Sequence, residues 1–281
     1  MKNKILIIGS SGYIGSFLKE KFSESNLYDV FYVDQNAVDP IESNFIKCRY
    51  QELQLKFLKQ FEVVLFFAGV SSVSKANLNN SFTIKENTID MFYFSELCFK
   101  ANARLIYASS GSVYADNSDN FIYPASEITL NSYDASKLSF DLISKYANPN
   151  SIGLRMGTVS GYSLNLREEL IFNQMCITSI RDKKILVSNC NNFRSLLFLD
   201  DLFIIIKKLL ISKNVGGQIP CSSYTGSIGQ IASSISNYFN SKIEVIDGSS
   251  TYSFALKKSN YDNQLSSSIE YQCKNFNEKW N

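Results

Sequence analysis

A glycine-rich turn directly after a short apolar run is the feature that most limits the fold of this chain. Ile5–Ile8 is predicted to be a buried strand, and Gly9-Ser-Ser-Gly12-Tyr-Ile-Gly15 follows it and opens a helical pattern. Glycine permits a tight turn and lets a phosphate approach the backbone amides at the start of a helix. This order predicts the first βα unit of a parallel sheet.

The same alternation of short apolar runs and helical patterns continues through the first two-thirds of the chain. Further strands are predicted at Val30–Val33, Val63–Ala68, Arg104–Ala108 and Ser151–Leu154, and helices at 13–25, 51–60, 82–101 and 132–147. Several of the strands are apolar at successive positions, which is typical of sheets covered on both faces. The fold class expected is therefore α/β, with a Rossmann-type doubly wound parallel sheet.

The pattern becomes less regular after Gly153. It predicts helices near 166–180, Asp200–Ile211 and 226–239, strands at Lys184–Val187, Leu196–Leu199 and Ile243–Val245, a break at Gly216-Gly217, and a small cap from Ser249 onward. We expect a dinucleotide-binding domain over 1–160 and 196–214. A small C-terminal substrate-binding lobe is expected over 161–195 and 215–281.

The amino-acid composition limits the kinds of catalytic site, metal site and binding partner that the chain can have. None of the 281 residues is histidine, which excludes Ser-His-Asp and Cys-His catalysis and imidazole metal ligands, so no metal is expected. The net charge of +2 is mixed along the chain, which argues against nucleic-acid binding. Six scattered cysteines without a CxxC pair are expected to be reduced. No apolar window is long enough to span a membrane, so a soluble, cytoplasmic protein is expected.

Asp34 ends the second predicted strand, 19 residues beyond Gly15. A carboxylate at this position accepts hydrogen bonds from both hydroxyls of an adenosine ribose and repels a 2′-phosphate. The alternative is an ordinary turn residue before Gln35-Asn36. Together with the glycines, Asp34 favours NAD over NADP as the cofactor.

Tyr133-Asp-Ala-Ser-Lys137 is the second signal. On a helix, positions i and i+4 share a face, so the lysine ammonium can lie near the phenol and favour its ionised form. A second copy, Tyr238-Phe-Asn-Ser-Lys242, shows that the spacing also occurs by chance, and we assign that copy to a helix surface. Only the first copy follows a serine cluster, Ser109-Ser110-Gly111-Ser112, at the end of a predicted strand. In open α/β sheets, the carboxyl ends of the strands line the ligand crevice.

These motifs together resemble the extended short-chain dehydrogenase/reductases, the NAD-dependent nucleotide-sugar epimerase/dehydratase family, over about residues 4–212. Asn87 matches an asparagine in the family's fourth helix, and Leu154-Arg155-Met-Gly-Thr-Val159 is similar to its segment after the sixth strand. Arg194-Ser-Leu-Leu-Phe-Leu-Asp200-Asp201 resembles the family's segment whose arginine reaches the substrate diphosphate.

The resemblance implies a role for each matched residue. Tyr133 would be the general base, Lys137 its activator and a ribose ligand, and Ser110 the partner of the sugar hydroxyl, with Ser109 and Ser112 as alternatives to Ser110. The implied cofactor ligands are Gly9, Ser11, Gly12, Tyr13, Ile14, Gly15, Asp34, Ala68, Gly69, Asn87, Ser109, Tyr133 and Lys137. The implied substrate ligands are Ser110, Gly111, Ser112, Arg155 and Arg194.

Departures from the family pattern limit the function. Gly111-Ser112 stands where the family's 4,6-dehydratases carry an Asp-Glu pair, which argues against that class. Other departures are Cys48, Ala115, Ser160 and Phe198. We expect hydride transfer at a ring carbon of a nucleotide sugar, with C4 as the favoured position. A 4-epimerase is slightly favoured over a 4-keto-sugar reductase, and a non-catalytic dinucleotide-binding regulator is the third hypothesis. The apolar surface of the segments 82–101 and 132–147, together with the family resemblance, predicts a homodimer.

Overall fold

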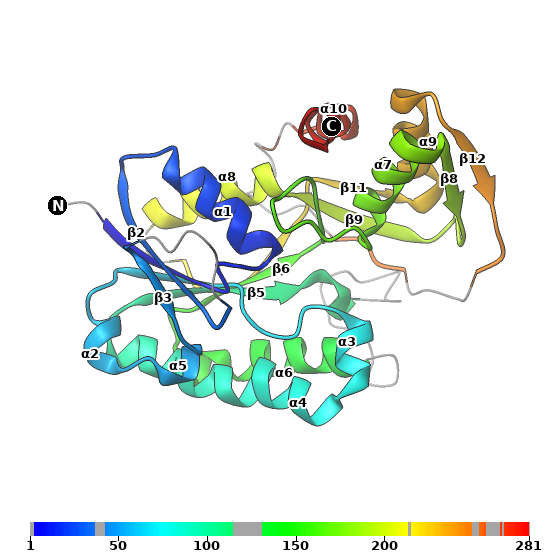
Figure 1. Ribbon diagram of the computed structural model, residues 1–281. Helices are drawn as coiled ribbons and strands as arrows, with labels where there is room; N and C mark the ends of the chain where they lie inside the picture. Colours follow the sequence, from blue (N-terminus) through cyan, green and yellow to red (C-terminus); the bar gives the residue numbers. More distant parts are fainter. Residues whose placement is uncertain are drawn as a thin grey trace. The chain divides into compact units, whose positions relative to one another are not determined.

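The chain forms two compact units in the computed structural model, which describes residues 3–36, 43–114, 131–212, 215–248, 253–256, 265 and 267–280 (Figure 1). Unit 1 comprises Met1–Val113, Leu130–Arg155 and Leu209–Ile219. Unit 2 comprises Tyr114–Thr129, Met156–Lys208 and Pro220–Asn281. The assignment of a cofactor to one part of the chain and a substrate to the other stays a prediction.

Unit 1 is built on a seven-stranded sheet in the order β10-β6-β5-β4-β1-β2-β3. The strands are β1 (Asn3–Ile8), β2 (Tyr28–Asp34), β3 (Phe45–Lys47), β4 (Val63–Phe66), β5 (Arg104–Ser110), β6 (Ile152–Met156) and β10 (Gly217–Cys221). The pairs from β3 through β2, β1 and β4 to β5 are parallel, with Ile5 aligned to Val30 on one side and to Val63 on the other. This order confirms the predicted doubly wound α/β fold.

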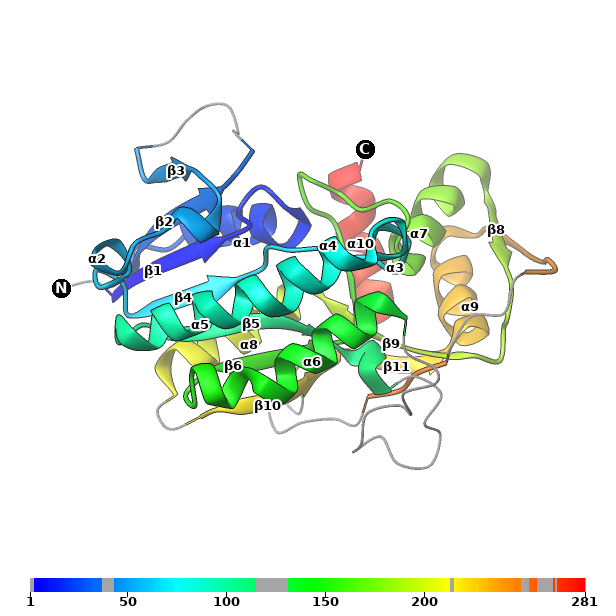
Figure 2. The same ribbon diagram turned by 90° about the horizontal axis from the view of Figure 1, so that it is seen from below.

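Helices cover both faces of this sheet. They are α1 (Tyr13–Ser23), η1 (Tyr50–Glu52), α2 (Leu55–Leu58), α3 (Val73–Leu78), α4 (Asn80–Ile84), the π-helical turn η2 (Lys85–Ile89), α5 (Asp90–Lys100), η3 (Gly111–Tyr114) and α6 (Ser132–Ala147). Helix α1 lies on one face, and α5 and α6 lie side by side on the other (Figures 1 and 2). Core side chains such as Leu6, Phe66 and Phe94 fill the space between the sheet and its helices.

Two predicted helices of unit 1 are interrupted. The prediction of a single helix over 51–60 is wrong. Leu53 is extended and buried, and it separates η1 from the four-residue α2. The segment 82–101 is helical throughout but contains the π-turn η2, which the periodicity did not reveal. Strands β3 and β10 and helix α3 were not predicted, and β10 begins at Gly217, where a break was expected.

Unit 2 holds a three-stranded and a two-stranded sheet with their own helices. Its strands are β7 (Thr158–Ser160), β8 (Lys184–Val187), β9 (Phe193–Phe198), β11 (Tyr224–Ser227) and β12 (Lys242–Val245), and its helices are α7 (Ile171–Asp182), α9 (Ile228–Phe239) and α10 (Ile269–Trp280). Helix α8 (Leu199–Ile211) belongs to unit 2 up to Lys208. The pair β11–β9 is antiparallel, whereas β7–β9 and β12–β8 are parallel.

The core of unit 2 joins α7, α9 and α10 to β8 and β9. Helix α10 was not predicted, yet it buries Ile269, Cys273 and Phe276 in this core. The second Tyr-x-x-x-Lys copy is not on one helix: α9 ends at Phe239, and Lys242 begins β12. Ala115 and much of the predicted cap from Ser249 onward lie outside the described residues.

The six cysteines carry free thiols, and four of them are buried. Within the described ranges, no helix is both long enough and apolar enough to cross a lipid bilayer.

Candidate active site

The turn between β1 and α1 brings three backbone segments into close contact. Gly9 has a φ of +83°, and a Cβ there would lie 2.6 Å from the Ala68 nitrogen. A Cβ on Gly15 would lie 2.1 Å from the Gly9 carbonyl oxygen. Only glycine fits at these two positions, because the clashing atoms belong to the backbone.

The start of α1 has the properties of an anion site. Gly12 is its N-cap and supplies no side-chain acceptor, and no acidic residue lies in the first turn, which Tyr13 and Ile14 begin. In the described part of the chain, the buried Ser10 hydroxyl lacks a hydrogen-bond partner. An unpaired hydroxyl and a helix N-terminus without a side-chain cap both fit the oxygens of a pyrophosphate.

Asp34 lies at the end of β2, beside this turn. Its Oδ2 accepts a hydrogen bond of 2.9 Å from the Ser11 amide, and its Oδ1 accepts one of 3.0 Å from the Asn36 amide. Each carboxylate oxygen can accept a second hydrogen bond, so ribose hydroxyls have acceptors here. Cys48 lies next to this position, since its amide donates to the Asp34 carbonyl at 3.1 Å.

Asn87, in the π-turn η2, holds the turn after β4. Its Oδ1 accepts from the Val70 amide at 2.9 Å and its Nδ2 donates to the Val70 carbonyl at 3.0 Å. Gly69 has a φ of +113°, and a Cβ there would lie 2.5 Å from Asn87 Oδ1. Asn87 Nδ2 also donates to Ser136 Oγ on α6 at 3.0 Å. This carboxamide therefore joins the predicted cofactor residues Ala68 and Gly69 to the helix that carries Tyr133.

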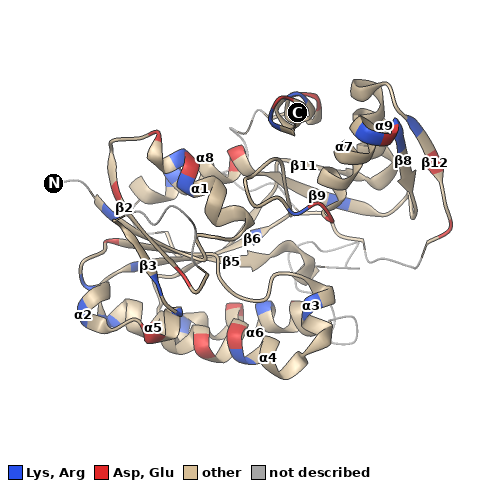
Figure 3. Cartoon of the chain, in the orientation of Figure 1, with Lys and Arg blue, Asp and Glu red and all other residues tan. Residues whose placement is uncertain are grey.

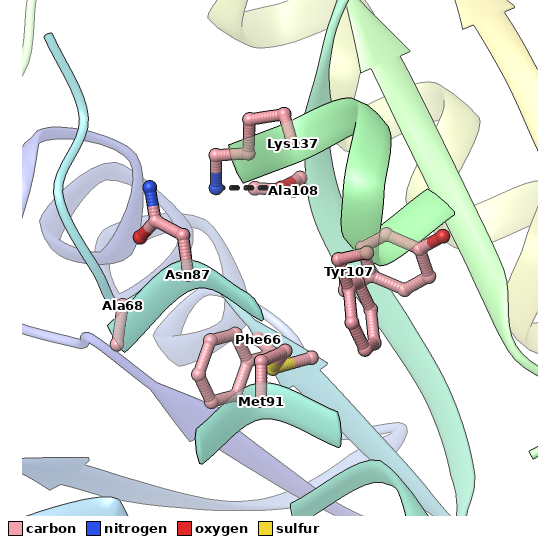
Figure 4. Close-up of a pocket in the computed structure, with 8 residues that line it drawn as sticks. Phe66, Ala68, Asn87, Met91, Tyr107, Ala108 and Lys137 are labelled. Carbon is pink, nitrogen blue, oxygen red and sulfur yellow. Dashed lines mark hydrogen bonds between the residues drawn. The ribbon is translucent and has the colours of Figure 1, made fainter. Parts of the chain in front are cut away.

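Tyr133 and Lys137 lie one helical turn apart on α6. The Lys137 ammonium is 5.9 Å from the centre of the Tyr133 ring and donates to the Ala108 carbonyl of β5 at 3.0 Å. Figure 4 shows Lys137 and Asn87 at a small pocket that Phe66 and Met91 also line. Burial lowers the pKa of Lys137 to about 8, and the negative charge of Asp141 partly opposes that shift.

The serine cluster continues β5 into η3. Ser110 Oγ lies 2.6 Å from Ser112 Oγ, and the Ser112 hydroxyl donates to Asp134 Oδ1 in the first turn of α6. Gly111 lies between the two serines and begins η3. The sequence predicted Ser110, Gly111 and Ser112 as site residues but did not single out Asp134, whose position directly after Tyr133 was the available signal.

Asp141 is a second buried carboxylate on α6, one helical turn after Lys137, and several side chains donate hydrogen bonds to it. It accepts hydrogen bonds from Tyr107 and Ser109, each at 2.9 Å, and from Arg155 Nε at 2.7 Å. Ser109 and Arg155 were predicted to bind cofactor and substrate, and both side chains are engaged with Asp141. Asp141 itself was missed, although it follows Lys137 by one helical turn.

Arg194 belongs to β9 of unit 2. Its Nη1 donates to the Phe193 carbonyl at 3.0 Å, and its guanidinium lies 5.5 Å from the centre of the Phe254 ring. Arg194 is buried, with a relative exposure of 9%. An aromatic ring and a backbone carbonyl within unit 2 therefore orient this guanidinium.

Electrostatically, the helices that cover unit 1 carry both signs of charge, with acidic and basic residues interspersed along them (Figure 3). Ion pairs such as Lys85–Asp90 and Lys100–Glu96 contribute to this mixture.

Residues 5–219 match the model of the NAD dependent epimerase/dehydratase family. Protein CapI of Staphylococcus aureus is 30% identical over 237 residues, covering 74% of this chain and 69% of CapI. An ADP-L-glycero-D-manno-heptose-6-epimerase of Brachyspira hyodysenteriae is 26% identical over 242 residues, covering 78% of this chain and 76% of that protein.

Solved structures share the fold. The UDP-glucuronic acid 4-epimerase of Bacillus cereus, in complex with UDP-glucuronic acid and NAD, superposes with a TM-score of 0.77. The two sequences are 20% identical, and the match covers 98% of each chain.

Proposed function

The chain belongs to the NAD-dependent epimerase/dehydratase family, a family of NAD-dependent nucleotide-sugar enzymes, and on that premise we propose that it is an epimerase acting at C4 of a nucleotide-activated sugar. The observation that carries the proposal is the grouping in unit 1 of a phenol, an ammonium and a serine hydroxyl at the carboxyl end of β5. These are Tyr133, Lys137 and Ser110. The start of α1, the buried Ser10 hydroxyl and Asp34 support NAD as the cofactor.

Each residue of this group has a separate task. The start of α1, the Ser10 hydroxyl and Asp34 would hold NAD, which would supply reversible acceptance of a hydride from the sugar carbon. Tyr133 removes the proton of the sugar hydroxyl and later gives it back, and the nearby Lys137 cation favours the ionised phenol. Ser110 holds the same sugar oxygen by a hydrogen bond. For inversion, the keto sugar must turn over so that hydride returns to its other face.

Two of the similar proteins favour inversion over a single reduction. The Brachyspira relative is a heptose-6-epimerase and the Bacillus structure is a 4-epimerase. These two proteins invert different carbons, so the choice of C4 is the more specific part of the proposal. The absence of an Asp-Glu pair at Gly111-Ser112 argues against a 4,6-dehydratase. The alternative is a 4-keto-sugar reductase, which would consume one NADH per turnover.

Product analysis distinguishes these reactions. The purified protein is incubated with UDP-glucuronic acid, other UDP-, dTDP-, GDP- and CDP-sugars and an ADP-heptose, and products are identified by NMR. We expect interconversion of two C4 epimers with NAD retained and no net NADH consumption. Inversion at C6 of the heptose alone would refute the C4 assignment, and stoichiometric oxidation of NADH by a 4-keto sugar would establish the reductase.

The catalytic assignment has a matched control within the chain. Tyr133→Phe should lower kcat at least about 100-fold, as removal of a general acid-base group does. Tyr238→Phe, in the second Tyr-x-x-x-Lys copy, should leave kcat unchanged because Tyr238 and Lys242 lie on separate elements of unit 2. Equal kcat values of the two variants would refute the assignment of Tyr133 as the general base, whereas a wild type that binds NAD and converts no nucleotide sugar would favour a non-catalytic, dinucleotide-binding regulator.

Unit 2 carries one of the proposed substrate ligands. Arg194, oriented by Phe254, suits the diphosphate of a nucleotide sugar, because a guanidinium binds phosphate oxygens in bidentate fashion. A homodimer is also part of the proposal: α5 and α6 expose Tyr93, Phe99, Leu142 and Tyr146. Apolar side chains exposed on neighbouring helices are typical of a subunit interface.

A further inference from the structure

The π-turn η2 joins separate parts of unit 1 through three consecutive polar residues. Glu86, Asn87 and Thr88 are all buried, and each side chain makes a hydrogen bond to another element of unit 1. A π-turn is a rare interruption of an α-helix and is frequent at functional sites. The partners of these three side chains therefore show which elements the turn holds together.

Asn87 and Thr88 connect the π-turn to the part of α6 that carries the proposed catalytic pair. Asn87 Nδ2 donates to Ser136 Oγ, and Thr88 Oγ1 donates to the Ser136 carbonyl, each at 3.0 Å. The Ser136 hydroxyl donates in turn to the Tyr133 carbonyl at 2.7 Å, and Lys137 follows Ser136 directly. The Asn87 carboxamide also pairs with the backbone of the turn after β4. Asn87 therefore fixes both this turn of α6 and the predicted cofactor turn after β4.

Glu86 anchors the other side of the π-turn to the residues around η1. Its Oε1 accepts a hydrogen bond of 2.6 Å from Arg49 Nη2. Gln51 Nε2 donates to both carboxylate oxygens, at 3.2 Å and 3.1 Å. The Tyr50 hydroxyl donates to the Glu86 carbonyl at 3.1 Å. Three successive residues thus hold Glu86, which directly precedes Asn87 in the π-turn.

An ordinary surface ion pair does not account for this arrangement. The Arg49 side chain is 48% exposed, but that of Glu86 is only 9% exposed. Because a buried carboxylate without partners is destabilising, Glu86 is confined to the place where Arg49 and Gln51 donate to it. Two exposed side chains that form an ion pair contribute little to a fold, whereas a buried carboxylate with donors on two side chains has one defined position.

The residues that hold Glu86 begin next to the predicted ribose ligand. The Cys48 amide donates to the carbonyl of Asp34 at 3.1 Å, and Arg49 follows Cys48 in the chain. Asp34 is the proposed acceptor for the adenosine ribose, whereas the phenol and the ammonium of α6 are proposed for the reaction itself. Glu86 therefore connects the segment beside the ribose ligand to the turn that holds the catalytic part of α6.

We propose that Glu86 is a positioning residue that holds the π-turn against η1, so that Asn87 fixes the cofactor turn after β4 and the turn of α6 that carries the phenol and the ammonium. This inference rests on the proposed function, since it takes Tyr133 and Lys137 as the catalytic pair. Glu86 itself is assigned no contact with NAD or with the sugar, because it acts through Asn87.

The first test measures the Kd of NAD by calorimetry and needs no turnover. Glu86→Ala removes the acceptor of Arg49 and Gln51, and it should raise this Kd at least about tenfold because the cofactor turn loses its fixed position. Asn87→Ala should raise the Kd by at least as much. In the Asn87→Ala background, Glu86→Ala should add less than about a further twofold, since both residues act along one path. A double variant whose increase in Kd is the product of the two single increases would overturn the proposal.

Further variants keep this test decisive. Glu86→Gln retains a carbonyl oxygen for Arg49 and should recover most of the affinity that Glu86→Ala loses. If Glu86→Ala does not fold, Arg49→Ala, at a half-exposed side chain, takes its place and should also raise the Kd. Lys85→Met is the matched control, because it breaks the ion pair with Asp90 and leaves Glu86 its donors, so the wild-type Kd and kcat should be kept. An equal loss of affinity in Lys85→Met and Glu86→Ala would overturn the assignment.

The second test measures kcat at saturating NAD and sugar. Glu86→Ala should lower kcat at least about tenfold even when both ligands are saturating, because the catalytic turn of α6 has lost its anchor. A purely structural Glu86 would instead lower the urea midpoint and leave the Kd and kcat of the folded protein unchanged, and this result would overturn the proposal.

The outcomes separate the two proposals. A wild type that binds NAD and converts no nucleotide sugar refutes the proposed function, and the Kd values still decide whether Glu86 acts through Asn87. A wild type that turns over while Glu86→Ala keeps its Kd and kcat refutes only the inference.

Discussion

The ion pair between Arg155 and Asp141 gives the largest stability effect that we expect in unit 1. Arg155 Nε lies 2.7 Å from Asp141 Oδ2, the Asp141 side chain is 0% exposed, and that of Arg155 is 11% exposed. Arg155→Met keeps the length of the side chain but leaves the carboxylate buried without its cation. Breaking a buried pair in this way costs about 3–5 kcal/mol.

The lower end of that range applies here. Tyr107 and Ser109 continue to donate hydrogen bonds to Asp141 after the arginine is removed, so the carboxylate keeps two of its donors. We expect a loss of about 3 kcal/mol in the free energy of unfolding. With a urea m-value of about 3 kcal/mol/M for a protein of this size, the midpoint should fall by about 1 M.

Urea titration followed by circular dichroism measures this loss. The matched control is Glu96→Gln, which breaks the exposed Lys100–Glu96 pair of α5 at 3.1 Å and should cost no more than about 0.5 kcal/mol. The double variant Arg155→Met/Asp141→Asn should recover part of the loss, because residue 141 then carries no buried negative charge that has lost its arginine. If Arg155→Met were as mild as Glu96→Gln, the carboxylate would not be buried with the arginine as its partner, and the reasoning would fail.

Three further predictions concern the cofactor turn, the lysine and the subunit interface. Gly15→Ala should abolish NAD binding in calorimetry, because its Cβ would lie 2.1 Å from a backbone oxygen, whereas Gly12→Ala, at 3.3 Å, should bind more weakly but measurably. Between about pH 8 and 10.5, the folded state binds fewer protons at Lys137 than the unfolded state does. The free energy of unfolding of the wild type, relative to that of Lys137→Met, should therefore rise with pH over this range. A difference in urea midpoints that does not change with pH would contradict the lowered pKa. Leu142→Glu combined with Tyr146→Glu, at positions 59% and 75% exposed on α6, should convert a dimer to a 31.8 kDa monomer in light scattering, and a monomeric wild type would refute the interface.

The parts of the fold that were predicted correctly from the sequence depend on neighbours along the chain. The glycine turn follows β1 directly, and Tyr133 and Lys137 need only one helical turn to come together. The strands β1, β2, β4, β5 and β6 all contain runs of apolar residues that the sheet and its helices bury. Such patterns can be recognised without knowledge of contacts that are distant in sequence.

The parts that were missed depend on contacts distant in sequence. Helix α10 places Ile269, Cys273 and Phe276 on one face, but a tail rich in serine, asparagine and lysine obscured this spacing. At the π-turn, the Asn87 carboxamide accepts a hydrogen bond from the Val70 amide in the turn after β4, and this contact is distant in sequence. Ser109 and Arg155 were assigned to ligands by resemblance, and only the fold shows that both side chains meet Asp141.

Helix α6 carries two buried carboxylates, and their partners imply different roles. Asp141 meets Arg155, so its negative charge is compensated and can stabilise the Lys137 ammonium one turn away. Asp134 meets only Ser112 and Asn131, which are neutral, and burial therefore favours its protonated form. The two carboxylates therefore lie in different electrostatic environments, since one has a cation partner and the other has hydrogen bonds from neutral side chains. The sequence shows both carboxylates, but only the fold shows that Asp141 pairs with Arg155 whereas Asp134 accepts hydrogen bonds from Ser112 and Asn131.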